Sequence, residues 1–432
     1  MKKYAGILII FLLLVACSNN DDGDSENEGG ESLTGTWTGQ IETPPIPLDF
    51  IVTFEDDEVW KGYLSIPIQN LHDYPLSNLS LQDDEISFDM ELPQETINFE
   101  GELTSDSSIE GTFTQRGLSF PFQLSEGDDS LEEDEDAVFL SVETEHGTLQ
   151  GELLVPEGVD EFPVVLIIPG SGPTDRDGNS AAMPGKNNSL KMLAEGLAEE
   201  GIASLRYSKR GAGENADAVI PEADVRFEDF INDAEAWIDL LKSDERFTQV
   251  GVVGHSKGAL IGLMAAKETD VDAYVSVAGA GVPTGDLLYE QLANQLPPAL
   301  LEEAEEILNS LRAGDVVDQI SEELYAVFRP EAQEFLMSWM AYDPAEELSE
   351  FNAPTLIVQG TTDIQVSEEN AEILHEAKSD SELLIVEGMN HVLKEAPEDE
   401  VGNIQTYTDP QLPLADGLVD GIVEFFNRIG FH

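Results

Sequence analysis

The sequence predicts an α/β fold, a mostly parallel sheet with helices on both faces and an inserted helical cap, preceded by a small all-β domain. Short runs of alternating apolar and polar residues fill 33–125, whereas apolar strands alternate with helical periodicities in 137–432. The length of 432 residues also exceeds that of one ordinary core, so two domains are expected.

The first residues are typical of a bacterial export signal. Two lysines precede an apolar run, 6–15, that is too short to span a bilayer. The next tetrapeptide ends in Cys17 and resembles the lipobox of bacterial lipoproteins, whose cysteine is acylated. We therefore predict a signal peptide over 1–16, lipidation at Cys17 and an extracytoplasmic protein that the lipid anchors to the cell membrane. The alternative is an ordinary signal peptide with an incidental cysteine.

Cysteine usage and two acidic stretches set further expectations. Cys17 is the only cysteine, so an intramolecular disulfide and a cysteine-built metal site are both excluded. After Cys17, the segment 17–32 contains no apolar residue that a core could bury. It is therefore expected to be a disordered acidic tether. A second acidic stretch, 126–136, is expected to link the two domains.

The charge of the chain excludes one class of partner. Acidic residues outnumber basic residues 88 to 20, which gives a net charge of −68. Nucleic acid phosphates would repel such a chain, so no nucleic acid is expected to bind. An acidic surplus that extends along a whole sequence also favours a halophilic source, because concentrated salt screens the self-repulsion.

This charge leads to a prediction about salt. The screening length falls from roughly 10 Å at about 0.1 M salt to roughly 3 Å at about 1 M. We expect both the melting temperature and the activity to rise between about 0.05 M and about 1 M NaCl, with most of the gain at the low end. Calorimetry in NaCl is the measurement, since sulfate would also strengthen hydrophobic burial. A flat or falling melting temperature would contradict the salt adaptation.

The segment 33–125 is expected to fold as a β-sandwich or barrel that serves as an accessory module. Its strands are predicted near 49–54, 85–90 and 97–103, with polar turn clusters between them. No group of titratable residues in this segment has a catalytic pattern.

The segment 137–432 has the pattern of a catalytic α/β domain. Its first continuous apolar run, 162–168, is typical of a strand covered on both faces. Further strands are expected at 202–207, 250–254, 271–278, 355–360 and 383–387, and a terminal amphipathic helix at 412–427. About 75 residues separate two of these strands, far more than a single crossover helix needs. We therefore expect a helical cap at about 283–350 whose apolar side could form an acyl pocket.

A G-x-S-x-G motif, Gly254-His255-Ser256-Lys257-Gly258, lies between an apolar strand and an apolar helix. The pentapeptide alone is weak evidence, but this setting is typical of a sharp strand-to-helix turn that presents a nucleophilic serine. The glycines leave room where neighbouring β-carbons would collide. Ser256 is therefore the predicted nucleophile.

A serine nucleophile needs a base and an acid that orients the base. His391, one of six histidines, follows directly after the last apolar strand and is the predicted base. His255 is expected to point to the other side of the turn, and His375 to lie within a helix. Asp363 follows a strand and completes the order serine, acid, histidine that this fold uses. Its rivals are Asp343 and Asp409, neither of which follows an apolar strand.

Acyl transfer also needs two N–H donors for the oxyanion. We expect one from the backbone of Lys257 and the other from the loop 170–179, with Ser171 as the candidate. The same glycine-rich loop could in principle cradle a phosphate, but no Gly-Lys-Ser/Thr pattern follows it.

Several segments together resemble bacterial α/β-hydrolases of the carboxylesterase and serine-aminopeptidase-like group. They are 170–179, 206–213, the turn at Ser256, Asp363 and His391, and the similarity extends from Val138 to the C-terminus. Members that resemble this chain often carry an N-terminal β module, and 35–39 with 115–117 look like that module.

The resemblance implies hydrolysis of short or medium acyl esters through an acyl-enzyme, without a metal or other cofactor. The expected partner is a small-molecule ester. One departure is Ser208, where the family pattern has an aspartate before Lys-Arg-Gly, and this could alter how Lys209 or Arg210 is held.

Three other functions stay open from the sequence. A peptidase of the same fold would keep the triad and add a charged anchor for a peptide terminus. An acyltransferase or thioesterase would pass the acyl group to, or take it from, a different nucleophile. In a noncatalytic envelope-binding lipoprotein the β module would carry the function, but a serine, acid and histidine in the expected order argue against this.

Overall fold

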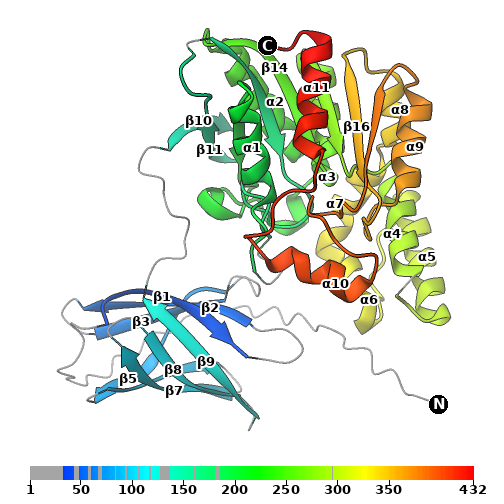
Figure 1. Ribbon diagram of the computed structural model, residues 1–432. Helices are drawn as coiled ribbons and strands as arrows, with labels where there is room; N and C mark the ends of the chain where they lie inside the picture. Colours follow the sequence, from blue (N-terminus) through cyan, green and yellow to red (C-terminus); the bar gives the residue numbers. More distant parts are fainter. Residues whose placement is uncertain are drawn as a thin grey trace. The chain divides into compact units, whose positions relative to one another are not determined.

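The computed structural model describes residues 33–42, 48–56, 60–66, 71–82, 84–92, 95–105, 108–115, 118–126, 137–159, 161–180, 185–293 and 295–432. The predicted signal peptide, Cys17, the tether 17–32 and all but the first residue of the linker 126–136 lie outside them. The described residues belong to two compact units, 33–126 and 137–432. Figure 1 labels the elements of both units.

The N-terminal unit is an antiparallel sheet in which nine strands are described. They are β1 (Gly35–Ile41), β2 (Leu48–Asp56), β3 (Trp60–Ile66), β4 (Leu71–Pro75), β5 (Ser77–Gln82), β6 (Glu85–Leu92), β7 (Glu95–Ser105), β8 (Ser108–Gln115) and β9 (Leu118–Glu126). Their order is β4-β3-β2-β1-β9-β8-β7-β6-β5. The three strands predicted from alternation lie within β2, β6 and β7.

This sheet curls until it is nearly closed. Leu76, between β4 and β5, donates its N–H to the Gly62 carbonyl of β3, 2.8 Å away, so the two ends of the strand order approach each other. The enclosed core is aromatic, and the Phe88 and Phe99 rings stack with their centroids 4.8 Å apart. A strand in such a sheet turns one face to this core and the other face to solvent. Its apolar and polar residues therefore alternate, which explains the sequence pattern.

The C-terminal unit contains a mixed, mostly parallel sheet in which eight strands are described. They are β10 (Val138–Thr144), β11 (Gly147–Leu154), β12 (Phe162–Ile168), β13 (Ala203–Tyr207), β14 (Phe247–His255), β15 (Ala273–Val277), β16 (Thr355–Gly360) and β17 (Glu382–Val386). Their order is β10-β11-β13-β12-β14-β15-β16-β17. The pairs that involve β10 and β11 are antiparallel and the others are parallel.

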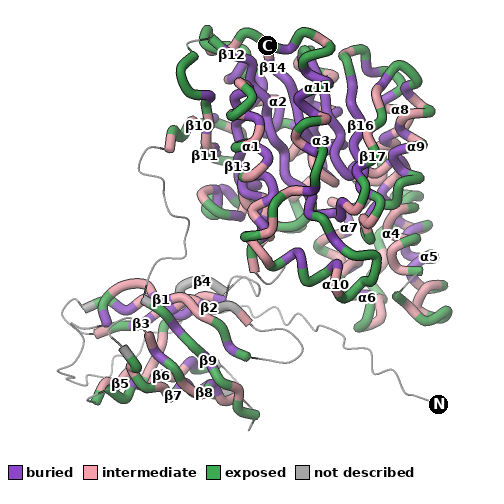
Figure 2. The backbone as a smooth tube through the Cα atoms, in the orientation of Figure 1, coloured by how far each residue is buried: buried purple, intermediate pink, exposed green. Residues whose placement is uncertain are grey.

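Helices cover both faces of this sheet. α1 (Ser189–Glu199) and α11 (Leu418–Ile429) bury their apolar sides on one face. α2 (Phe227–Ser243), α3 (Lys257–Thr269) and α9 (Glu368–Ala377) cover the other. Successive residues of β12 enter the two cores alternately, which is why this strand is apolar throughout. Figure 2 shows the buried residues concentrated along these strands.

The predicted helical cap is present between β15 and β16. It consists of α4 (Thr284–Ala293), α5 (Pro298–Arg312), α6 (Glu322–Phe328), α7 (Pro330–Met340) and α8 (Pro344–Ser349). Its apolar residues form a small core of their own, centred on Leu308 and Phe328. Most of the apolar residues expected over the site are therefore used for packing within the cap.

The terminal helix was predicted to begin too early. Leu412 precedes a proline, which disfavours helical backbone at that residue, and α11 begins only after Gly417, whose φ is 86°. The short helix α10 (Glu400–Gln405) lies before it. Among all the helices that the structure describes, none combines the length and the apolarity that a membrane crossing requires.

Candidate active site

Ser256 occupies the tight turn between β14 and α3. Its backbone has φ 54° and ψ −123°, a conformation that costs a non-glycine residue about 1–3 kcal/mol. The flanking glycines allow this turn. A β-carbon on Gly258 would lie 2.3 Å from the Ile168 carbonyl oxygen, and one on Gly254 would lie 2.4 Å from the Gly258 oxygen. The close backbone packing therefore requires glycine at both positions of the motif. The resulting turn holds Ser256 at the end of a central strand.

A chain of hydrogen bonds connects the three predicted triad residues. His391 Nε2 lies 3.1 Å from Ser256 Oγ, and His391 Nδ1 lies 2.8 Å from Asp363 Oδ2. The three residues follow β14, β16 and β17, whose carboxyl ends share one edge of the sheet. The structure thus brings together residues separated by up to 135 positions.

Asp363 is held as a carboxylate by four donors. Its Oδ1 accepts the N–H groups of Gln365 at 2.8 Å and Val366 at 3.0 Å, and its Oδ2 also accepts Gln359 Nε2 at 3.0 Å. Burial acts to raise the pKa of this carboxyl, but His391 and the hydrogen bonds outweigh it and lower the pKa below its ordinary value. Asp363 is therefore ionised and fixed in orientation.

The rival residues have local structural partners instead. Asp343 caps α8 by accepting the N–H groups of Ala345 and Glu346. Asp409 accepts the N–H of Gln411 at 2.9 Å, and His375 Nδ1 lies 2.9 Å from Ser381 Oγ. None of these contacts involves Ser256.

His255 does not point away from the site as expected. Its Nε2 lies 2.7 Å from the backbone oxygen of His391, and the two rings are 5.1 Å apart. The loop after β17 brings this carbonyl group to the His255 ring. Burial, followed by the influence of His391, lowers the pKa of His255 to about 4. His255 is therefore neutral, and its Nε2–H donates to the loop that carries His391.

We expect His255→Phe to lower kcat by about ten- to a hundredfold, because the loop loses a donor that sets the position of His391. KM should change little, and thermal unfolding should show a folded protein. The kcat–pH profile of a p-nitrophenyl ester, measured beside unfolding curves, separates misplacement of the base from global damage. An unchanged kcat would contradict a positioning role.

Ser171 and Lys257, the predicted oxyanion donors, line the same cavity as Ser256. Within the described part of the chain, neither backbone N–H donates a hydrogen bond. The cavity has a volume of about 270 Å³. Its apolar lining includes Leu260 of α3, Leu287 and Leu288 of α4, and Trp339 of α7.

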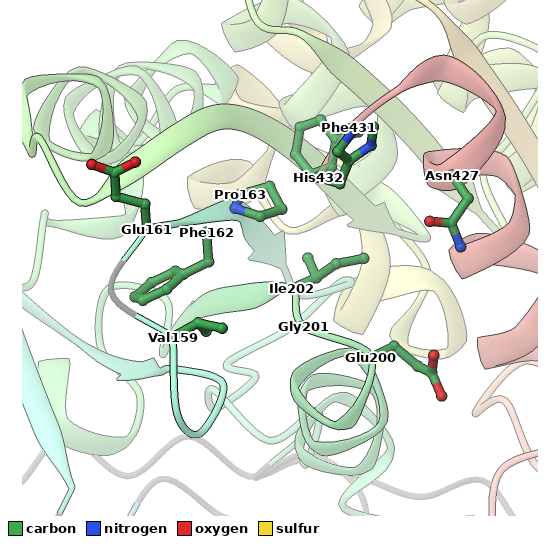
Figure 3. A pocket seen from close by; sticks show the side chains of 10 residues that line it. All are labelled: Val159, Glu161, Phe162, Pro163, Glu200, Gly201, Ile202, Asn427, Phe431 and His432. Carbon is green, nitrogen blue, oxygen red and sulfur yellow. The ribbon is translucent and has the colours of Figure 1, made fainter.

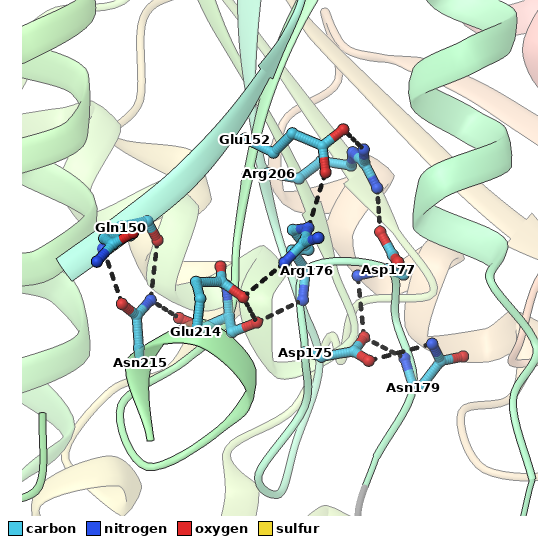
Figure 4. Close-up of polar contacts among 10 residues, drawn as sticks. Gln150, Glu152, Asp175, Arg176, Asp177, Asn179, Arg206, Glu214 and Asn215 are labelled. Atoms are coloured by element: carbon cyan, nitrogen blue, oxygen red, sulfur yellow. Dashed lines mark hydrogen bonds and ion pairs between the residues drawn. The ribbon is translucent and has the colours of Figure 1, made fainter. Parts of the chain in front are cut away.

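A buried ionic network ties down the loop that carries Ser171 (Figure 4). Glu152 of β11 accepts Arg176 at 2.8 Å and Arg206 at 2.6 Å, and Arg206 also pairs with Asp177. Asp175 Oδ1 accepts the N–H groups of Asp177 and Asn179. Burial, with a contribution from Asp177, raises the pKa of Asp175 to about 6. These N–H groups are already occupied by a carboxylate, which argues against the phosphate-cradling alternative.

Ser208 fits this network without the family's aspartate. Its Oγ accepts the N–H of Arg176 at 2.9 Å and lies 2.6 Å from Glu214, which also pairs with Arg176. Lys209 donates to the Gly170 carbonyl, while Arg210 pairs with Asp233. Glu214 thus supplies the negative charge that Ser208 lacks, and Lys209 and Arg210 both keep partners.

A second cavity of about 210 Å³ lies where strands β12 and β13 begin (Figure 3). It is bordered by Phe162 at the start of β12, by Ile202 just before β13, and by Phe431 near the C-terminus. Substrates of open α/β sheets bind at the carboxyl ends of the strands. This cavity lies at the amino ends of β12 and β13, so it is not expected to bind the substrate of the reaction.

Three contributions to the site were not predicted from the sequence. They are the contact of His255 with the His391 loop, the position of the Lys257 side chain, and the contacts of Gln359. A polar Gln359 inside the apolar strand 355–360 was a visible signal, because a buried amide needs partners. Its Nε2 contacts Asp363 and the Val366 carbonyl at 2.8 Å. No group of three or more histidine, cysteine or acidic residues that could hold a metal occurs in the described ranges.

Comparison with known proteins finds sequence similarity for the C-terminal unit. The model of the serine aminopeptidase S33 family matches residues 186–397. The esterase EstD of Thermotoga maritima is 28% identical over 248 residues, 57% of this chain, and the match spans 58% of the length of EstD.

Solved structures of esterases also align with the chain. Est1E from Butyrivibrio proteoclasticus is 16% identical with a TM-score of 0.44, covering 68% of this chain and 99% of Est1E. An esterase from Pyrococcus furiosus is 17% identical with a TM-score of 0.43, covering 68% of this chain and 91% of that one. The C-terminal unit, with its mixed, mostly parallel sheet covered by helices on both faces, thus has the α/β-hydrolase fold, and its sequence is similar to the serine aminopeptidase S33 family and to an esterase.

Proposed function

We propose that the protein hydrolyses carboxylic esters with short or medium acyl chains, with Ser256 as nucleophile, His391 as general base and Asp363 as the orienting acid. The observation that carries this proposal is the continuous hydrogen-bond chain Asp363–His391–Ser256 beside an apolar cavity. The esterase name of the Thermotoga maritima relative supports the same reaction class.

The geometry supports a two-step reaction. His391 Nε2 takes the hydroxyl proton as Ser256 Oγ attacks the ester carbonyl, and the N–H groups of Ser171 and Lys257 receive the oxyanion. The same proton passes to the leaving alcohol as the C–O bond breaks, leaving an acyl-enzyme. Water then attacks the acyl carbon, again with His391 as base, and releases the acid and Ser256.

The cavity limits the acyl group. A volume of about 270 Å³ is below the range of about 300–1,000 Å³ that drug-sized ligands occupy. Leu260, Leu287 and Leu288 offer apolar contacts, so a short or medium hydrocarbon chain fits the lining better than a polar one. Long acyl chains would need the cap to move.

The lining also favours an esterase over an aminopeptidase. An aminopeptidase must bind the α-ammonium group of its substrate, which calls for a carboxylate near Ser256. Among the described residues that line the cavity none is acidic, and the charged side chain present is the cation Lys257. A substrate ammonium group would therefore meet repulsion.

The test compares p-nitrophenyl butyrate with alanine p-nitroanilide on the purified protein. We expect rapid release of p-nitrophenol from the ester and negligible release of p-nitroaniline. The reverse preference would make the peptidase the correct function. A panel of p-nitrophenyl esters of increasing acyl length then measures how much the cavity holds.

A further inference from the structure

The side chain of Lys257 lies in an aromatic cage. Its Nζ is 4.7 Å from the ring centroid of Phe230, 5.0 Å from that of Phe335 and 5.4 Å from that of Trp339. The residue is only 8% exposed. Ring faces attract a cation, but they cannot accept the three strong hydrogen bonds that an ammonium group can donate.

Lys257 differs from the other buried lysines in having no polar partner. Lys209 donates to the Gly170 carbonyl, Lys378 to the Phe351 carbonyl and to Asp380, and Lys394 to the Leu412 carbonyl. Across the described residues, the Lys257 ammonium makes cation–π contacts and neither a hydrogen bond nor an ion pair. In a chain with 88 acidic residues and 20 basic ones, leaving a buried cation unpaired is a costly arrangement.

The residue that carries this cation borders the cavity where a substrate would lie. Lys257 lines the cavity that contains Ser256, and Trp339, one ring of the cage, lines the same cavity. Burial lowers its pKa to about 8, so the side chain is mostly protonated at neutral pH. A bound anion would stabilise the protonated form further.

We propose that the side chain of Lys257 recognises a carboxylate on the substrate, so that the preferred substrates are esters that also carry a free carboxylate group. The inference rests on the proposed esterase function and refines its substrate class. The substrate carboxylate would supply the missing partner of Lys257, inside a cage whose rings exclude water. Ser256 and Lys257 line one cavity, so a small ester would place its carbonyl group at Ser256 and its carboxylate at Lys257.

The carboxylate could belong to the acyl group or to the alcohol, and two substrate pairs distinguish these cases. The acyl pair is mono-p-nitrophenyl glutarate and its methyl ester, p-nitrophenyl methyl glutarate. The alcohol pair is 4-carboxyphenyl butyrate and phenyl butyrate. Each pair yields a ratio of kcat/KM, charged over neutral, in about 0.5 M NaCl, where the repulsion from the net negative charge is screened.

We expect a ratio of at least about ten in the wild type for one of the pairs, since a charge-assisted hydrogen bond in an enclosed site is strong. Lys257→Met keeps the length and the ring contacts of the side chain, and its ratio should fall at least about tenfold. Lys257→Arg should retain most of the preference. The neutral ester serves as the internal reference in every variant, because the ratio cancels any effect of the substitution on catalysis that both esters share.

Lys191→Met on the exposed side of α1 is the matched control, since it removes one lysine charge far from the cage. Its ratio should equal that of the wild type. A wild-type ratio near one for both pairs would overturn the inference, and so would ratios that stay unchanged in Lys257→Met. Either result would leave the esterase proposal intact as long as the wild type hydrolyses the neutral esters. If the wild type hydrolyses none of these esters, neutral or charged, the esterase proposal itself is refuted.

Discussion

Ser256→Ala is expected to lower ester turnover by at least about a thousandfold while the protein stays folded. Alanine lacks the oxygen of the proposed nucleophile, and the neighbouring groups can then only bind and polarise the substrate. The substitution is small and sits beside a cavity, so the core is unaffected. Turnover of p-nitrophenyl butyrate and a thermal unfolding curve, measured on the same preparation, check both parts of this expectation.

Covalent labelling gives an independent reading of the same residue. A fluorophosphonate should modify Ser256 in the wild type, and mass spectrometry of the labelled peptide locates the site. His391→Ala should prevent rapid labelling, because the proposed base, 3.1 Å from Ser256 Oγ, is then missing. Full activity in Ser256→Ala, or a label on another serine, would refute the assignment.

Asp363→Asn is expected to lower kcat by about a thousand- to ten-thousandfold. The amide oxygen can replace Oδ1, which accepts the N–H groups of Gln365 and Val366. The amide nitrogen then faces His391 Nδ1 and forces the tautomer in which Nε2 carries the proton. His391 can no longer accept the proton of Ser256, and the negative charge that stabilises the imidazolium is lost.

Asp343→Asn is the control for this variant. Asp343 caps α8 with its side chain, and asparagine is also a good helix cap, so kcat should stay within about twofold of the wild type. The kcat of both variants is measured with p-nitrophenyl butyrate at several pH values. An Asp363→Asn variant with near-normal kcat would point to another orienting acid.

Local patterns in the sequence were sufficient for the fold class and for most elements. The strand at 162–168 could be predicted because a strand covered on both faces must be apolar throughout, and β12 is buried along its whole length. The cap could be predicted because its intervening segment is too long for one crossover. Boundaries were less accurate, as α11 shows, since proline and glycine act on single residues.

The candidate triad could be named from scarcity and order. Six histidines leave few bases, and Asp363 and His391 each follow an apolar strand, so parallel pairing takes them to the same edge. The structure brings these residues within hydrogen-bonding distance, while their roles in catalysis stay predictions for the variants above. The need for glycine on both sides of Ser256 could also be predicted, because the turn leaves no space for side chains there.

By itself the sequence determined the fold class, the helical insertion, the position of the sharp turn at Ser256 and a short set of candidates for the triad. These depend on periodicity, on neighbours in the chain, or on the scarcity and order of the residues. Only the tertiary structure decided that His255 supports the loop of His391, that Glu214 compensates for Ser208, and that three rings from α2 and α7 enclose Lys257. These contacts join residues up to 136 positions apart. Their energies depend on burial and on which partners are absent, and both arise only when distant segments pack together.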